Sequence, residues 1–529
     1  MAKDFFLPTT GIRTSQATLL VIDDYSLPLR RNLCYYLSKP SYRREPVLTP
    51  SRENRDAPDF IGTHFYGTVL LDEGKPFDRA QGKPFDNAQG KYRMWYYAVG
   101  LAEERGRLQE GPICYAESDD GLHWVKPALR QVQYKGSWDN NAIAIPDPRT
   151  EGIEIIKDDD DPDPNRRYKA VYESFVPSRR YPTARTATSA DGLHWTAGPE
   201  TPVAQSMEQS GFYKFNGLYF VNAQMWPLGE GGRKRGRQGH VAVSPDFDHW
   251  LPEIGESFAL PEPEQAGNQF AYDQVHLGNA AFSLGNVLVG LYCIWHARPN
   301  PGDWFGLATT SGDLGLLVSN DGFHFREPVK GHIYMSEKEN PATPAPGFTY
   351  PTILEQCNGI LNVGDETRIY HGRWRNAPYV NPSITIDKSI ESQFYQDLYY
   401  AEVGLATLPR DRWGALGLFP DQVEGTVWTC PVTLPNERAL SLSKGGVQVA
   451  LNADRACDMR VEIADERFNL LPAYSGEKSG TTQVEGGLGC PVAWPAGSLE
   501  QLGRETVRFR VAVKRNGTAE PRLFAIYLR

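Results

Sequence analysis

Acidic side chains recur just before, or at the start of, the runs that we predict to be the first strand of each structural repeat. They are Asp59, Asp139, Glu208, Asp273 and Glu355. A carboxylic acid can donate a proton to a leaving group, while a second, ionised carboxylate attacks carbon or activates water. If the strands converge, these carboxylates converge with them. The pattern therefore predicts a pocket for acid–base chemistry, in which Glu208, Asp139, Asp59 and Asp273 are the catalytic candidates.

Other polar and aromatic side chains near these segments are candidates for holding a substrate. They are His64, His276, His371, Arg373, Trp226 and Asn140, and Glu173 is a further acid. Each histidine suits substrate hydroxyls or a sulfate or phosphate group, and a satisfied core histidine is an equally good interpretation. The spacing of the histidines does not match a metal site, so we predict neither a metal nor a cofactor.

A short phrase recurs along the chain and marks the repeat. It reads Ser-Asp-Asp-Gly-Leu-His-Trp at 118–124 and returns, with substitutions, at 189–195, 244–250 and 319–325, while a weaker fifth copy ends at Trp413. Asp followed by Gly supplies the side-chain acceptor and the positive φ of a tight turn. We therefore predict a turn on the outer part of each repeat. Four histidines in these turns are expected to be structural: His123, His194, His249 and His324.

Strand-like runs precede each copy of the phrase and predict antiparallel units of four strands. In the second unit we predict the first strand at 142–145 and the next at 168–172. Five such units predict an all-β fold, with a five-bladed β-propeller over residues 41–425. Residues 426–529 alternate without helical periods and predict a β-sandwich. Residues 1–40 contain strands that we expect to clasp the propeller or close its ring.

Composition agrees with this fold and excludes several classes of protein. Of 529 residues, 50 are Gly, 40 are Pro and 12% are aromatic, which favours short strands and turns. The net charge of −10 makes nucleic acid a poor partner. No run approaches the ~18 apolar residues of a membrane span, so we predict no membrane partner. The N-terminus lacks an apolar signal segment, so we expect a cytoplasmic protein, or a secreted or periplasmic one if a leader was removed.

Two segments depart from the repeat. A tandem octapeptide occupies 75–90 and an acidic run occupies 158–163. We interpret both as surface turns without chemistry, because loop tips tolerate insertion. The acidic run lacks the alternate spacing and the glycine of a dedicated calcium loop.

In a propeller the first strand of each blade lines the central channel, so side chains before those strands meet in one pocket. This arrangement resembles the five-bladed β-propeller glycoside hydrolases, the group of invertases, fructanases, arabinanases and xylosidases. The resemblance covers residues 15–425 by architecture, and the trailing sandwich is most similar to the invertase type. The segment 208–220 matches the third-blade motif of the family, which implies that Glu208 is the general acid.

Two other motifs of that family are altered here. Trp138-Asp139-Asn140 keeps the second-blade Asp but lacks the Arg and Pro of the family pattern. His64-Phe65-Tyr66-Gly67 stands where the family carries a first-blade Asp. The resemblance then implies that the partner of Glu208 comes from Asp59 or from another blade, with Asp273 the next choice.

The resemblance implies an enzyme that hydrolyses glycosidic bonds of an oligo- or polysaccharide with paired carboxylates, and a carbohydrate as its partner. Three alternatives stay open. A phosphorylase of related fold would hold phosphate with side chains such as His371 and Arg373. A sialidase has similar turn phrases, but it has six blades and an arginine triad. A non-catalytic carbohydrate-binding propeller fits the missing first-blade acid.

Overall fold

The computed structural model describes residues 4–72, 90–101, 108–147, 149–174, 183–199, 203–205, 207–225, 237–258, 273–296, 311–343, 352–375, 400–435, 447–497 and 499–529. In these ranges the chain forms β-strands, turns and a few short 3-10 helices, with no α-helix, so the prediction of an all-β fold is confirmed. No helix in these ranges is long and apolar enough to cross a membrane. Most of the octapeptide at 75–90 lies outside the described residues.

The described strands between residues 62 and 409 fall into five antiparallel groups, which we number units one to five in chain order. Unit one contains β7 (Gly62–Asp72), β8 (Lys91–Leu101) and β9 (Leu108–Ser118). Unit two contains β10 (Thr150–Lys157), β11 (Tyr168–Ser174), β12 (Thr183–Ser189), β13 (Thr196–Ala197) and β14 (Ala204–Gln205). Unit three contains β15 (Glu208–Phe215), β16 (Leu218–Met225), β17 (Gln238–Ser244) and β18 (Gly255–Phe258).

Unit four contains β19 (Asp273–Ser283), β20 (Leu288–His296), β21 (Ser311–Ser319) and β22 (Ile333–Met335). Unit five contains β23 (Thr352–Glu355), β24 (Ile360–Val363), β25 (Glu366–Arg375) and β26 (Tyr400–Pro409). Short parallel contacts from β21 to β23 and from β26 to β7 join units four, five and one into a single sheet. We interpret each unit as a blade, and the number of blades remains a prediction.

The first strands of the units lie against one another. Thr68 on β7 accepts a hydrogen bond from the Ile155 amide on β10 at 2.8 Å, and Asn358 of unit five donates to the Phe212 carbonyl on β15 at 2.8 Å. β19 packs beside β15. Side chains near the starts of these strands are therefore brought to a common centre.

The recurrent phrase forms the predicted turn. In the first copy, Asp120 Oδ1 accepts the backbone N–H groups of Leu122 and His123 at 2.7 and 2.8 Å, and Gly121 has a φ of 73°. Asp120 Oδ2 binds Nδ1 of the exposed His123 ring at 2.7 Å. The other three full copies repeat this pattern at Asp191, Asp246 and Asp321. The histidines thus close their own turns, as predicted.

Each turn is also held by the unit that precedes it around the centre. Four of these contacts are hydrogen bonds from an aromatic side chain to a turn carbonyl, at 2.8–3.1 Å: Tyr370 to Gly121, Trp95 to Gly192, Tyr213 to Gly322 and Tyr334 to Trp413. Between units two and three, Arg166 instead binds Asp248 at 2.9 Å. Because Tyr370 belongs to unit five and Gly121 to unit one, the series closes on itself.

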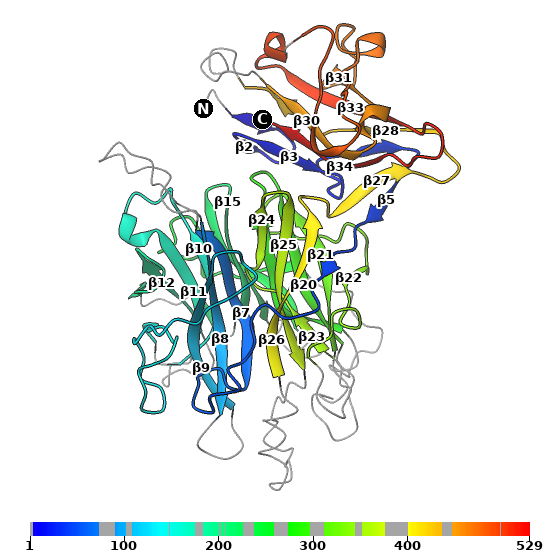
Figure 1. The fold of residues 1–529 in the computed structure, drawn as a ribbon. Coiled ribbons are helices and arrows are strands. Elements are labelled where there is room, and N and C mark those ends of the chain that lie inside the picture. Colours follow the sequence, from blue (N-terminus) through cyan, green and yellow to red (C-terminus); the bar gives the residue numbers. More distant parts are fainter. Residues whose placement is uncertain are drawn as a thin grey trace, which may run out of the picture.

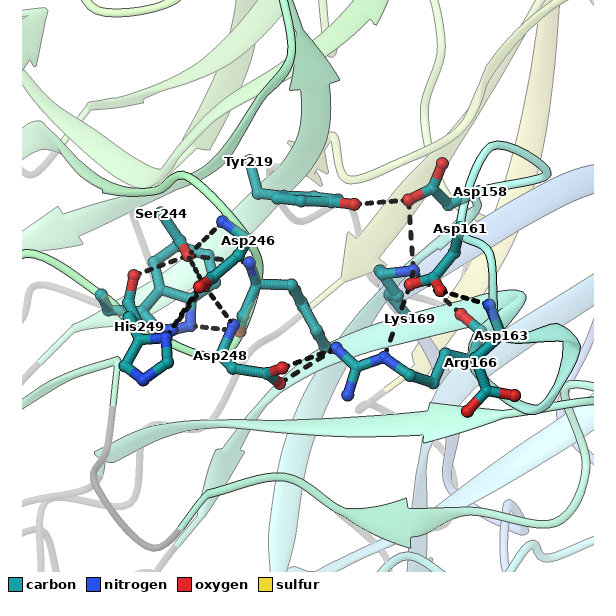
Figure 2. Close-up of polar contacts among 12 residues, drawn as sticks. Asp158, Asp161, Asp163, Arg166, Lys169, Tyr219, Ser244, Asp246, Asp248 and His249 are labelled. Carbon is teal, nitrogen blue, oxygen red and sulfur yellow. Dashed lines mark hydrogen bonds and ion pairs between the residues drawn. The ribbon is translucent and has the colours of Figure 1, made fainter.

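The acidic run at 158–163 is more than a surface turn, which corrects the sequence interpretation. The side chain of Lys169 is fully buried, and its Nζ lies 3.1 Å from Asp158 Oδ2 and 2.6 Å from Asp161 Oδ2 (Figure 2). Asp158 also accepts hydrogen bonds from Lys214 and Tyr219 of unit three, at 2.8 and 2.5 Å. A buried ammonium requires carboxylate partners, so part of the run is drawn into the contact between units two and three.

Two further sheets form the C-terminal part of the protein (Figure 1). The first has the order β2-β1-β29-β33-β28-β4, with β31 beside β33, and the second has the order β32-β30-β34-β27-β5, with β3 beside β34. Their strands are β1 (Phe5–Leu7), β2 (Ile12–Thr14), β3 (Ala17–Leu20), β4 (Leu29–Arg31), β5 (Leu33–Leu37), β27 (Gly414–Leu418), β28 (Glu424–Trp428), β29 (Val432–Thr433), β30 (Val449–Asp454), β31 (Met459–Asp465), β32 (Gly487–Pro491), β33 (Thr506–Lys514) and β34 (Arg522–Leu528). The assignment of these sheets as a sandwich remains our interpretation.

The N-terminal strands belong to these sheets. Their segment also contacts unit four, where Asn286 Oδ1 accepts the Thr18 amide at 2.7 Å and Asn320 donates to Asp23 at 2.9 Å. The expectation that residues 1–40 clasp the propeller or close its ring stays a prediction. β3 pairs with β34, β5 with β27, and β4 with β28. They supply hydrogen-bond partners to C-terminal strand edges that would otherwise carry unpaired backbone groups. Because β27 begins at Gly414, the C-terminal sheets also begin before the predicted boundary at 426.

Candidate active site

Five glutamates from three units gather at the starts of the inner strands. They are Glu151 and Glu154 on β10, Glu173 on β11, Glu208 on β15 and Glu355 on β23, and we call them the acidic cluster. Glu151 and Glu173 are direct cross-strand partners. Glu154, Glu173 and Glu355 are buried, whereas Glu151 and Glu208 keep partial exposure. The last two are therefore the carboxyl groups that a substrate can reach.

Burial and the charges of neighbouring carboxylates raise the pKa values of the glutamates in the cluster. Burial, together with the charge of Glu208, raises the pKa of Glu151 to about 8, although Arg149 and Arg237 oppose the shift. Burial also raises the pKa of Glu173 well above its usual value, and the charges of Glu208, Glu151 and Glu154 add to this. Two carboxylates that interact this strongly do not ionise together, so the cluster retains protons near neutral pH.

Two neighbouring side chains favour the ionised form of the Glu208 carboxyl group. Burial raises its pKa, but the positive charge of Arg237 and a hydrogen bond from Gln224 favour its ionised form. Gln224 Nε2 donates to Glu208 Oε2, and Gln224 Oε1 accepts the Leu277 amide at 2.9 Å. Leu277 has a φ of 63° where the β19 ladder is interrupted, so this irregularity fixes the side chain that holds Glu208.

Histidine and aromatic rings form a wall beside the acids. The His276 ring lies 4.4 Å from Trp295 and 6.4 Å from Trp374, and the His64 ring lies 4.7 Å from Trp374, all between centroids. His276 Nδ1 is 3.9 Å from Glu355 Oε1. Burial lowers the pKa of His64 to about 3 and that of His276 well below its usual value. Both rings are therefore neutral at pH 7 and suit hydroxyl groups better than anions.

Glu355 is the glutamate that unit five contributes to the cluster. Burial raises its pKa well above its usual value, a hydrogen bond with Tyr66 opposes this, and the charges of Glu208 and Glu151 add to it. Glu355 is the last residue of β23, and its Oε1 lies 3.9 Å from Nδ1 of His276.

Three of the predicted catalytic residues lie outside this cluster. Asp59 is buried, but its Oδ2 binds Lys126 at 2.5 Å and Tyr96 at 2.8 Å, which is a structural ion pair. Asp139 is exposed in the loop before β10, and the neighbouring Asn140 side chain donates to loop carbonyls. Asp273 is exposed and binds His296 at 2.7 Å. Of the four predicted acids, only Glu208 is brought into the cluster.

Of the predicted binding residues, some lie at the acidic cluster and others lie away from it. His64 and His276 line the acidic cluster. His371 and Arg373 lie on the opposite face of β25 from Trp374; His371 contacts Asn340, and Arg373 binds Glu402 at 2.8 Å. Trp226 lies outside the described residues. Among the described residues, no group of three or more His, Cys, Asp or Glu side chains is arranged to hold a metal ion.

The sequence interpretation missed Glu151 and Glu154 because it placed the first strand of unit two too early. Residues 142–145 form no strand; Ala142 makes an isolated bridge to Cys114, at the edge of β9. The strand is β10, with the sequence Thr-Glu-Gly-Ile-Glu-Ile-Ile-Lys. It carries a glutamate near its start and apolar residues further along, and β15, which begins with Glu208, has the same pattern. This shared pattern was the available signal.

Comparisons with known proteins place the chain among distant structural neighbours. No family model and no curated protein matches it. A glycosyl hydrolase from Bacteroides ovatus is 16% identical, with 71% of this chain and 95% of that chain covered and a TM-score of 0.40. A β-1,2-mannobiose phosphorylase from Listeria innocua is 12% identical, with 72% and 97% covered and a TM-score of 0.40.

A GH32 β-fructofuranosidase from Bombyx mori is 11% identical, and the match covers 92% of this chain and 94% of that chain with a TM-score of 0.38. Identities and TM-scores this low transfer no activity to the chain. Its function therefore has to be argued from the acidic cluster.

Proposed function

We propose that the chain is a glycoside hydrolase that cleaves a glycosidic bond of an oligo- or polysaccharide at the acidic cluster. The observation that carries the proposal is the pair of partly exposed, electrostatically coupled carboxyl groups of Glu151 and Glu208. Glycoside hydrolysis needs one protonated carboxyl group for the leaving oxygen and one ionised carboxylate for the anomeric carbon or for water. A coupled pair that shares one proton supplies both.

We assign the proton donor to Glu151, because its raised pKa keeps it protonated near neutral pH. Glu208, whose ionised form Arg237 and Gln224 favour, takes the role of the ionised partner, in place of the general-acid role that the third-blade motif implied. Buried Glu173 and Glu355 keep their protons because their pKa values are raised, so the ionised carboxylate of the pair supplies the negative charge that favours the positive charge developing on the sugar ring. His64 and His276 are buried together with Trp295 and Trp374, so these rings form the wall of low polarity that raises the pKa values of the neighbouring acids.

Two variants test the proposal. Glu208→Gln and Glu151→Gln should each reduce turnover of an unactivated oligosaccharide by roughly 10²–10⁴-fold. With an aryl glycoside whose leaving group needs no protonation, the donor variant should recover most of its rate, and the partner variant should not. The opposite pattern exchanges the two roles. Normal turnover in both variants would refute hydrolysis at this site.

A phosphorylase is the second candidate, because the charges of Arg237 and Arg149 both act on Glu151. Two guanidinium groups whose charges act on a reactive carboxyl group suit a phosphate nucleophile. Measuring products with and without inorganic phosphate separates the candidates: a sugar 1-phosphate that forms only with phosphate would favour the phosphorylase. A chain that binds the oligosaccharide and releases no product in either buffer would be the non-catalytic propeller.

A further inference from the structure

A groove of about 800 Å³ crosses the C-terminal sheet that contains β28, β33 and β31, remote from the acidic cluster. This sheet is the upper layer in Figure 1, and the sheet with β30 and β34 lies nearer the five units. Val427, Val511 and Val461 point into the buried core, so the alternate residues of the same strands face the groove and solvent. The volume is in the range of ligand sites.

The groove has a floor of small side chains between two arginines. Arg31, Thr426, Ala512 and Arg460 are successive cross-strand neighbours across β4, β28, β33 and β31. Four strands place the two arginine backbones roughly 14 Å apart. Thr426 and Ala512 leave depth in the middle, while residues 457–458 and 481–483 form a wall beyond β31. A short extended molecule therefore fits across the sheet with an arginine at each end.

The charges in the groove are mostly positive, on a chain whose net charge is −10. Arg510 is bound to Glu462 at 2.7 Å, and Asp458 is bound to Arg455 at 2.8 Å. Within the described part of the chain, Arg31, Arg460 and Lys514 have no ion pair, and Glu424, the cross-strand neighbour of Lys514, is the other lining carboxylate. Cations gathered in this way repel one another unless an anion lies between them.

We propose that this groove binds an anionic oligosaccharide whose carboxylate or sulfate groups meet Arg31 and Arg460. The planar guanidinium group pairs with both anions through two parallel hydrogen bonds. Thr481, Thr482 and Gln483 offer hydroxyl and amide groups to the sugar hydroxyls. None of the lining residues is aromatic, so charge and hydrogen bonds carry recognition. The choice of a sugar rests on the proposed function, and the groove would hold the polymer while the acidic cluster cleaves it.

Calorimetric titration of the full chain tests the groove directly. The background is Glu208→Gln, so that no probe is turned over. The probes are an oligogalacturonate, a sulfated galactan oligosaccharide and a neutral galactan of equal length. We expect the neutral probe to bind about tenfold more weakly or worse, and anionic binding to weaken as salt rises. The anionic probe that binds more tightly identifies the carboxylate or the sulfate as the ligand group.

Variants locate the binding. Arg31→Ala and Arg460→Ala should each weaken anionic binding about tenfold, and Ala512→Trp should do the same by filling the floor while keeping every charge. Lys330→Ala removes an exposed cation of unit four and should change nothing. All groove variants should keep their melting temperature. When they are made in the chain that retains Glu208, they should also keep their turnover of a small aryl glycoside.

Three results would overturn the proposal: equal binding of neutral and anionic probes, unchanged binding in all groove variants, or a dimer that the groove variants dissociate, because the groove would then receive a second copy of the chain. Binding is measured without turnover, so its failure leaves the hydrolase proposal standing. Conversely, loss of the hydrolase proposal leaves groove binding measurable.

Discussion

Glu151 on β10 and Glu173 on β11 are direct cross-strand neighbours, so two carboxyl groups share one face of unit two near its inner edge. Like charges placed opposite one another in a sheet destabilise it. The raised pKa of each group relieves this conflict, because a shared proton removes one of the charges. The fold therefore depends on the protonation of its own candidate active site.

Stability should fall as pH rises through the neutral range. The folded-state pKa of Glu151 is about 8 against a usual value of 4.5, so the folded chain keeps a proton that the unfolded chain releases. This contribution is complete below about pH 4.5 and is lost as pH rises to about 8. Urea denaturation of Glu151→Gln across that range should show a flatter dependence than the parent. Glu477→Gln, at an exposed site, should keep the parental slope, and equal slopes in all three proteins would contradict the assignment.

Gln224 should tune Glu208 and not merely support the fold. Its hydrogen bond favours the ionised carboxylate, so Gln224→Leu should raise the pKa of Glu208 and move the acidic limb of the activity profile to higher pH. Turnover should also fall about tenfold or more, because the carboxyl group loses its fixed orientation. A lower melting temperature with an unmoved pH profile would show a purely structural role.

The buried ion cluster of unit two should be costly to break. Lys169→Met leaves Asp158 and Asp161 without their central cation and should lower the free energy of unfolding by about 3–5 kcal/mol. Lys91→Met breaks an exposed pair with Glu117 and should cost about 0–1 kcal/mol. Chemical denaturation of both variants gives the comparison, and similar costs would argue that Lys169 is not held as described.

The turn phrase predicts unequal roles for its Asp and His. Asp191 accepts the amides of Leu193 and His194 and also binds the His194 ring. Asp191→Ala should therefore lower the free energy of unfolding by about 2 kcal/mol. His194→Ala removes one exposed contact and should cost less than about 1 kcal/mol. Thermal melts of the two variants would test this order, and a larger loss for His194→Ala would reverse it.

Features set by neighbouring residues were predictable from the sequence. The turn at Asp120 depends on hydrogen bonds within a few consecutive residues, and the positive φ of Gly121 follows from the residue type. Glu208 was found because an acid, a strand and an Asn-Gly turn follow one another within a short segment.

Features set by distant partners were not predictable in the same way. Residues 142–145 alternate as a strand does, but no complete ladder is available to them, and Asp139 is left exposed beside them. The strands β3 and β5 have ordinary strand patterns, and nothing in those patterns specifies β34 or β27 as partner. Lys169 likewise gives no local sign that its side chain is buried.

The pairing of Ala17–Leu20 with the last strand of the described chain has a consequence for biosynthesis. β3 is translated before the five units and β34 after them, so β3 has to wait for its partner while the five units between them can form in order. Until then the backbone edge of β3 is unpaired, and such edges favour aggregation. Contacts between distant parts of the sequence also close slowly. Emergence of β34, and not of any one of the five units, therefore sets the moment at which the edge of β3 is protected against misassembly.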